Sequence, residues 1–250
     1  MKERKYFCEG RELDEQQFFN KLRRESSVSR IQKTVKMLET GEYALDIGCY
    51  IGHMTIKIAE RYKKVIGIDI LPHNIKYARQ LFARPNIEYM VMDAQNIASN
   101  FKAETFDCVV LTEVLEHIAN PYLLIQSCHR LLKKDGIMIV STPNALSLKS
   151  YIDYLTLRSI THAVKRLEST EMGVGTQVDH IFNWDPFSLA RFFIMSGFKI
   201  KKLDFAGAYL PDKIRWLARI LLRRDLAEPK WLLPILGRFA CQTIFKFSKS

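Results

Sequence analysis

The sequence has few cysteines, and no two of them have the spacing of a redox or zinc motif. The chain of 250 residues contains five, an odd number, scattered as Cys8, Cys49, Cys108, Cys128 and Cys241. Small disulfide-stapled proteins use even sets of cysteines, and structural zinc sites use CxxC pairs. This usage argues against both classes and favours a reducing, cytoplasmic location.

The sequence also lacks a signal-like start and an uninterrupted apolar span. MKERKYFCEGRELDEQQ is charged and has no apolar h-region, so we expect no secretory signal. The apolar stretch 231–247 is interrupted by Pro234, Gly237 and Arg238, and it is shorter than the about 20 residues that a membrane span needs.

Acidic residues are scarce toward the C-terminus. The net charge is +11, and residues 199–250 supply +8 of it, with 12 Lys/Arg against 4 Asp/Glu. Such a segment is either a solvated basic surface or a contact for an anionic partner. Residues 209–225 predict a basic amphipathic helix. We consider three roles for it: packing on the body or on a partner subunit, peripheral contact with an anionic membrane, and nucleic-acid binding.

Apolar runs alternate with helical stretches through the middle of the chain. Buried strands are expected at 43–47, 64–70, 86–93, 106–112 and 136–142. A helix is expected over 12–39, another over 185–197 with Asp185 as N-cap, and a last strand over 198–205. The order predicts an α/β fold with a doubly wound, mostly parallel, Rossmann-like sheet and helices on both faces. Ligands of such sheets bind at the carboxyl ends of the strands.

The sequence predicts that the chain has three parts. They are an N-terminal helical segment (1–40), a main domain (41–205) and a basic amphipathic C-terminal extension (206–250). The alternation stops after STPN, and residues 145–180 form a less regular helical insertion after the fifth strand. Because an insertion there lies over the strand ends, we expect it to cover the acceptor as a lid.

The glycines after the first strand do not form the dinucleotide fingerprint GxGxxG. In LDIGCYIGH, aligning the fingerprint on Gly48 places Tyr50 and His53 where its other glycines belong, although Gly52 follows four residues on. Asp46, just before the turn, would repel a pyrophosphate. These residues argue against a nicotinamide dinucleotide.

Acidic residues end the next two strands. Asp69 comes 21 residues after Gly48 and suits the hydroxyls of a ribose, while Asp93 suits an adenine amino group. The pattern predicts a ligand with a ribose, an adenine and a cationic end, but without phosphate.

Five segments carry a family resemblance: LDIGCYIGH, VIGID, VMDA, FDCVVLTEVLEHI and LLKKDGIMIVSTPN. In this order they resemble the class I S-adenosylmethionine-dependent methyltransferases, nearest the branch that contains ubiquinone-biosynthesis O-methyltransferases. The resemblance covers residues 40–205. It implies a seven-stranded sheet, S-adenosylmethionine as cofactor and S-adenosylhomocysteine as product.

The resemblance also implies roles for matched positions. Asp46, Gly48 and Gly52 would surround the methionine end, Asp69 the ribose and Asp93 the adenine, with Glu113 near the end of the fourth strand. Tyr50 departs from the family, which usually has glycine there. The full candidate cofactor set is Asp46, Gly48, Tyr50, Gly52, Asp69, Ile70, Asp93, Ala94 and Glu113.

Each assignment has a purely structural alternative. Asp69 can cap the following helix, Asp93 can serve a turn, and Glu113 and Glu116 can be solvated or ion-paired. Tyr50 can pack away from the ligand, line the entrance or mark a site that no longer binds cofactor.

If the acceptor is a hydroxyl, a histidine base suits neutral pH. His117 in EVLEHI and His180 in VDHIFNW are the candidates, and either can instead hold a loop in place. No spacing of histidines and carboxylates predicts a metal ligand.

The leading prediction is O-methylation of a small or lipid- or glycan-linked acceptor. An RNA- or protein-modifying methyltransferase that uses the basic tail is one alternative, although TEVLEH stands where an N/D-PPY motif would be expected. A non-catalytic scaffold that kept the fold is another.

Overall fold

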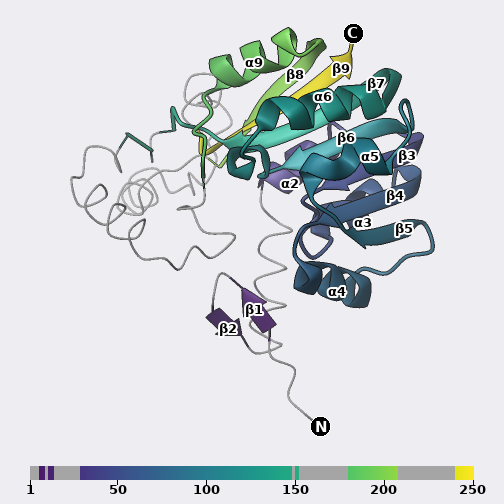
Figure 1. Ribbon diagram of the computed structural model, residues 1–250. Helices are drawn as coiled ribbons and strands as arrows, with labels where there is room; N and C mark the ends of the chain where they lie inside the picture. The colour runs from purple at the N-terminus through teal and green to yellow at the C-terminus, as the bar shows by residue number, and fades with distance from the viewer. Residues whose placement is uncertain (1–5, 9–10, 14–28, 148–149, 152–179, 208–239) are drawn as a thin grey trace, which may run out of the picture.

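A computed structural model describes residues 6–8, 11–13, 29–147, 150–151, 180–207 and 240–250 (Figure 1). The central feature is a seven-stranded sheet in the order β5-β4-β3-β6-β7-β9-β8. Its first five strands are parallel, and β9 runs antiparallel to β7 and β8. The strands are β3 (Gly41–Ile47), β4 (Tyr62–Asp69), β5 (Ile87–Val91), β6 (Phe106–Thr112), β7 (Leu132–Pro143), β8 (Phe198–Ala206) and β9 (Gln242–Lys249). The predicted fold class is confirmed.

Helices cover both faces of this sheet. One face packs against α5 (Ile97–Asn100), α6 (Pro121–Leu131) and α9 (Pro186–Met195), whose apolar side chains join those of Leu45 and Val109. The other packs against α2 (Ser29–Val35) and α3 (His53–Ile58), beside Ala44 and Val110, and α4 (Pro72–Leu81) packs on Tyr89. Adjacent strand residues thus enter opposite cores, which explains why the strands are apolar throughout.

The last strand corrects the predicted C-terminal boundary. Residues 242–249 were assigned to an extension outside the main domain, but they form β9 between β7 and β8. The stretch TIFKF is rich in β-branched and aromatic residues, which suit a strand buried on both faces. Phe247 stacks on Phe193 of α9 with ring centroids 4.2 Å apart.

The N-terminal prediction is partly wrong. Residues 6–8 and 11–13 form a small antiparallel pair, β1 (Tyr6–Cys8) and β2 (Arg11–Leu13), where a helix was expected to start at 12. The helix expected over 12–39 is described only as α2. Most of the expected lid (145–180) and the whole predicted helix 209–225 lie outside the described residues.

Local signals place α9 correctly. The side chain of Asp185 accepts hydrogen bonds from the backbone N–H groups of Phe187 and Ser188 at 2.8 and 3.0 Å, and Pro186 opens the helix. Gly197 follows the helix with φ 90°.

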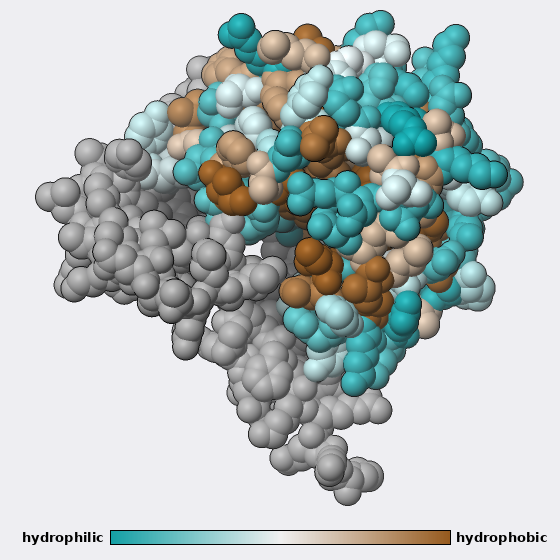
Figure 2. Space-filling model, viewed as in Figure 1, coloured by the Kyte–Doolittle hydropathy of each residue, from teal (hydrophilic) through white to brown (hydrophobic). Residues whose placement is uncertain are grey.

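Figure 2 shows apolar groups separated by hydrophilic ones on the described part of this face. Among the described residues, no helix is both long and apolar enough to cross a bilayer.

Candidate functional site

The turn between β3 and α3 contains three residues with positive φ: Gly48 at 68°, Tyr50 at 51° and Gly52 at 97°. A Cβ on Gly48 would lie 2.2 Å from Cγ2 of Val114, and one on Gly52 would lie 2.5 Å from the hydroxyl oxygen of Tyr89. Packing within the chain therefore already excludes larger residues at both glycines. No ligand needs to be invoked to explain them.

Tyr50 occupies a backbone conformation that favours glycine. The positive φ gives a physical reason for the glycine that the family resemblance implies at this position. The side chain of Tyr50 is partly buried and packs on Ile51, which Tyr77 and Leu81 of α4 also contact. The ring thus packs on the residue that follows it, and the backbone N–H of Tyr50 donates to Asp69.

Asp69, at the end of β4, connects the turn to the next helix. Its Oδ2 accepts from the N–H of Tyr50 at 2.9 Å. Its Oδ1 accepts from the N–H of Leu71 at 2.9 Å and from Nδ2 of Asn74 at 3.1 Å. Each carboxylate oxygen has two lone-pair directions, so one of those on Oδ2 remains for a ligand hydroxyl. Asp69 therefore does cap α4, and it retains room for one further donor.

Asp46 is enclosed beneath α3 and is fully buried. Its Oδ2 accepts from the hydroxyl of Thr55 at 2.6 Å, whereas Oδ1 is buried without a partner. Burial raises the pKa of Asp46 to about 7; the Thr55 hydrogen bond opposes this shift, and the charge of Asp69 adds to it. A buried carboxyl group with an unpaired oxygen favours positive charge nearby. Asp46 therefore favours a cationic group at the turn that follows β3.

The end of β5 lies beside that of β4. Asp69 is in register with Val91, and Asp93 caps the turn η1 (Ala94–Asn96) by accepting from the N–H of Gln95 at 2.9 Å. Ile70 is 57% exposed at the same edge, and Ala94 is partly buried. An exposed isoleucine next to Asp69 offers an apolar surface for a flat ring with polar groups at its edges.

Glu113, at the end of β6, is held by three other elements. It has φ 55°, and its Oε1 accepts from the hydroxyl of Ser141 on β7 at 2.8 Å. Its Oε2 accepts from Nε2 of Gln242 on β9 at 3.2 Å. Arg30 of α2 lies 3.4 Å from Oε1, and its Nε is buried without a partner. Glu113 therefore joins α2, β7 and β9 at the strand ends, as the ion-paired alternative predicted.

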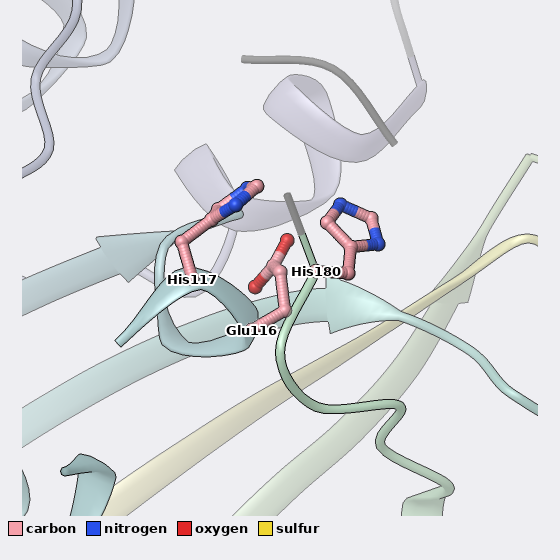
Figure 3. A group of neighbouring side chains, drawn as sticks. All are labelled: Glu116, His117 and His180. Atoms are coloured by element: carbon pink, nitrogen blue, oxygen red, sulfur yellow. The ribbon is translucent and has the colours of Figure 1, made fainter. Parts of the chain in front are cut away.

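Beyond Glu113, the structure brings the two candidate histidines together (Figure 3). The rings of His117 and His180 have centroids 4.7 Å apart, although 62 residues separate them in the sequence. The carbonyl of Glu116, in the turn η2 (Leu115–His117), accepts from the N–H groups of Ile181 and Phe182 at 2.8 and 3.1 Å. These bonds hold His180 beside His117.

The carboxyl group of Glu116 completes this trio. One of its oxygens and one ring nitrogen from each histidine lie within 4.8 Å of one another. No sequence spacing had predicted such a cluster of metal-binding residue types. Two imidazoles and a carboxylate are donors that zinc and other divalent cations accept, and they are also groups that can transfer protons.

Sequence patterns do not predict the roles of two residues at this site, Arg30 and Glu116. Arg30 was not a candidate, because it lies in a helix far from the strand-end motifs. Glu116 was weighed only as a solvated or ion-paired residue, yet it is 1% exposed and both of its carboxyl oxygens lack hydrogen-bond partners. The only sequence signal for a role of Glu116 at the site is its position next to His117.

Known proteins share this architecture. The "Methyltransferase domain" family model matches residues 18–203. The ubiquinone biosynthesis O-methyltransferase of Psychrobacter cryohalolentis is 32% identical over 125 residues, which are 48% of this chain and 48% of that protein. The chain thus matches about half the length of this curated relative.

Solved structures agree on the fold. A SAM-dependent methyltransferase from Archaeoglobus fulgidus superposes with a TM-score of 0.60 at 20% identity, covering 93% of this chain and 98% of the other. The N-methyltransferase NodS from Bradyrhizobium japonicum WM9, in complex with S-adenosyl-l-homocysteine, gives 0.56 at 14% identity over 91% and 86%. The chain therefore belongs to the methyltransferase-domain family, and its fold is that of the class I S-adenosylmethionine-dependent methyltransferases.

Proposed function

We propose that the chain binds S-adenosylmethionine at the carboxyl ends of β3 to β6 and methylates an oxygen of a small acceptor. The observation that carries this proposal is the pair of carboxylates at the ends of two paired strands, Asp69 ending β4 and Asp93 coming after β5, with Ile70 exposed next to Asp69. A nucleoside without phosphates suits these groups, because carboxylates accept its hydroxyl and amino hydrogens and would repel a phosphate.

The described residues fit the three parts of this cofactor. Oδ2 of Asp69 can accept one ribose hydroxyl, and the second oxygen of Asp93 can accept from the adenine amino group while Ile70 packs on the ring. Arg30 brings positive charge and an unpartnered Nε to the strand ends, which suits the methionine carboxylate. On this assignment, Asp46 and the turn that contains Gly48 and Gly52 would lie near the ammonium group of the cofactor's methionine part.

When bound, the cofactor supplies an activated methyl group. The protein must then orient the acceptor, exclude water and remove one proton from the acceptor hydroxyl. His117 and His180 stand together as proton acceptors. An oxygen acceptor is supported by the histidine pair and by the names of the curated relatives, which are O-methyltransferases.

Calorimetric titration with S-adenosylhomocysteine tests the cofactor site. We expect micromolar binding by the wild type and at least a tenfold loss, about 1.4 kcal/mol, in Asp69→Ala. Because Asp69 also supports the turn, Ile70→Ser is a second variant: its side chain is mostly exposed, so the fold should tolerate it. Glu88→Gln, on β5 and paired with Lys64, is the control that should bind normally. No binding by folded wild type would favour the scaffold alternative.

The basic segment 209–225 is proposed as a peripheral contact with an anionic membrane that carries a lipid-linked acceptor. Co-sedimentation with vesicles containing phosphatidylserine tests this. Deleting residues 209–250 would remove β9, so the suitable variant reverses Arg215, Arg219 and Arg223 to glutamate. Unchanged sedimentation of that variant would contradict the membrane role, and salt-sensitive RNA binding by the wild type would favour a nucleic-acid acceptor.

A further inference from the structure

We propose that the outer side of α9 and the edge strand β8 form a docking surface that lies flat on a bilayer containing anionic lipids. This surface is separate from the basic segment 209–225, and it belongs to the described part of the chain. It does not depend on cofactor binding, so it can be tested without S-adenosylmethionine and without an acceptor.

The first argument is that α9 is apolar on two opposite sides. Leu189 and Phe193 point into the core and are fully buried. At about 3.6 residues per turn, Phe187, Ile194 and Met195 lie on the other side of the helix. These three side chains are 79%, 54% and 75% exposed. Because a helix that is apolar all round is normally buried all round, we expect the outer side of α9 to be covered in the functional protein.

The apolar surface continues onto β8, which lies beside α9 at one end of the sheet (Figure 1). Ile200 and Leu203 of β8 are opposite Phe247 and Phe245 of β9, and both phenylalanines join the core beneath α9. Directly paired residues point to the same face of a sheet, so Ile200 and Leu203 lie on the face that α9 covers. Each is nevertheless 42% exposed. The helix therefore leaves this face uncovered along the outer edge of the sheet.

Basic residues accompany these apolar ones. Arg191 is exposed on the outer side of α9, and that helix contains no acidic residue. The only acidic residue of β8, Asp204, pairs with Lys33 of α2 at 3.2 Å. Three lysines of β8 are exposed: Lys199, Lys201 and Lys202. A positively charged surface of this kind suits a partner that carries negative charge.

Charge and shape together favour a bilayer as that partner. A second copy of this chain would bring the same basic residues against one another, since a two-fold interface pairs one surface with itself. Segment 209–225 has five Lys/Arg against two Asp, so its charge is also of the same sign. An acidic helix of a partner protein would need an apolar groove, whereas Phe187 and Met195 stand on the outside of a helix. Exposed apolar side chains among cations suit the boundary between headgroups and acyl chains.

Docking through α9 would also bring the candidate site to the membrane. The helix begins at Pro186, six residues after His180. Six residues span at most about 20 Å, so His180 lies within that distance of the start of α9. The apolar side chains would enter the bilayer boundary, and the cations would remain at the lipid phosphates.

The test is co-sedimentation of the full chain with vesicles of phosphatidylcholine and phosphatidylserine. The double variant Phe187→Ser/Met195→Ser should lower vesicle partition about tenfold or more, because two side chains no longer leave water. Both side chains are mostly exposed, so the fold should tolerate the change. Tyr43→Ser is the matched control: it removes an aromatic ring that is 40% exposed on β3, away from β8, and should bind normally.

The charged part of the surface has its own pair of variants. Lys201→Glu should lower partition into these vesicles about fivefold or more, and the loss should shrink as salt is raised. Lys76→Glu makes the same change of charge on the exposed side of α4 and should stay within about twofold of wild type. Vesicles of phosphatidylcholine alone should bind the wild type more weakly than the mixed vesicles.

Three results would overturn the proposal. The first is a wild type that does not sediment with the mixed vesicles. The second is a partition that the α9 double variant leaves unchanged while reversal of Arg215, Arg219 and Arg223 abolishes it, since segment 209–225 would then be the whole membrane contact. The third is a wild-type dimer that the α9 double variant dissociates, because the surface would then bind a second copy.

Binding of S-adenosylhomocysteine separates this surface from the cofactor site. All variants of α9 and β8 should bind it as the wild type does, because none of these residues lies at the ends of β3 to β6. If vesicles bind as expected but S-adenosylhomocysteine does not, the proposed function fails and the docking surface stands.

Discussion

The backbone N–H of Tyr50 donates to Oδ2 of Asp69 at 2.9 Å. The residue that departs from the family pattern therefore supports the carboxylate that follows β4. Tyr50 fulfils this role in a left-handed conformation, with φ 51°. Tyr50 thus makes a hydrogen bond that supports Asp69 while its own backbone is strained.

Tyr50→Gly and Tyr50→Ala separate these contributions. Both variants lose the ring that packs on Ile51, but only glycine relieves the positive φ. We expect Tyr50→Gly to be more stable than Tyr50→Ala by about 1 kcal/mol in urea unfolding. Equal stability of the two variants would mean that the turn changes its conformation once the ring is gone.

Asp46 predicts a particular pH dependence of stability. Its pKa in the folded protein is raised to about 7, above the ordinary 3.8. The folded state therefore binds more protons than the unfolded state between these values, and stability falls as pH rises from about 4 to 7. The full effect is at most about 4 kcal/mol. Asp46→Asn should remove this loss, so the variant should gain relative to wild type across that range.

Asp107 provides the opposite case. Partial burial would raise its pKa, but hydrogen bonds from Lys133 and from the backbone of Tyr43 outweigh burial, and the pKa is lowered. Its contribution is present above the unfolded pKa and is lost as pH falls. Asp107→Asn should therefore lose stability relative to wild type as pH rises through the acidic range. Thermal unfolding of both variants from about pH 2 to about pH 7.5 checks the contrast, and parallel trends would contradict it.

Gly48 and Val114 should be energetically coupled. A Cβ on Gly48 would meet Cγ2 of Val114 at 2.2 Å, and φ is 68°. Gly48→Ala should cost about 3 kcal/mol, from overpacking and from backbone strain. Adding Val114→Ala should recover the overpacking part alone, which a double-mutant cycle would report as a coupling of about 1–2 kcal/mol. Strict additivity would mean that strain accounts for the whole cost.

Arg30 and Lys33 lie on the same helix and provide a matched comparison. Arg30 faces Glu113 at the strand ends, whereas Lys33 pairs with Asp204 of β8 at 3.2 Å. If Arg30 receives the methionine carboxylate, Arg30→Met should weaken S-adenosylhomocysteine binding about tenfold, and Lys33→Met should leave it within about twofold. Similar losses in both variants would point to a general role of α2 in stability.

The parts of the fold that were predicted depend on local signals. Asp185, Pro186 and Gly197 mark the start and end of α9 by their own backbone preferences, and the apolar runs locate the parallel strands. The position of β9 depends on pairing with β7, a hundred residues earlier, so no local pattern could place it. The requirement for glycine at position 48 likewise depends on Val114, a distant residue in the sequence.

The candidate site divides in the same way. Asp69 and Asp93 follow strands whose parallel order brings their ends together, so their proximity was predictable. The contact of His117 with His180 depends on two backbone hydrogen bonds to Glu116 across a long insertion. The role of Arg30 depends on where α2 packs. Sequence patterns predict neither the contact between the two histidines nor the position of Arg30 beside Glu113.

The position of β9 has a consequence for how the protein is made. In the sheet, β8 pairs with β9, and β9 alone joins it to β7. A ribosome synthesises β8 well before β9, so β8 emerges with no neighbour to pair with, and the edge of β7 is equally uncovered. The nascent chain thus exposes two strand edges until β9 has left the ribosome, a state in which chaperone binding would protect it from aggregation.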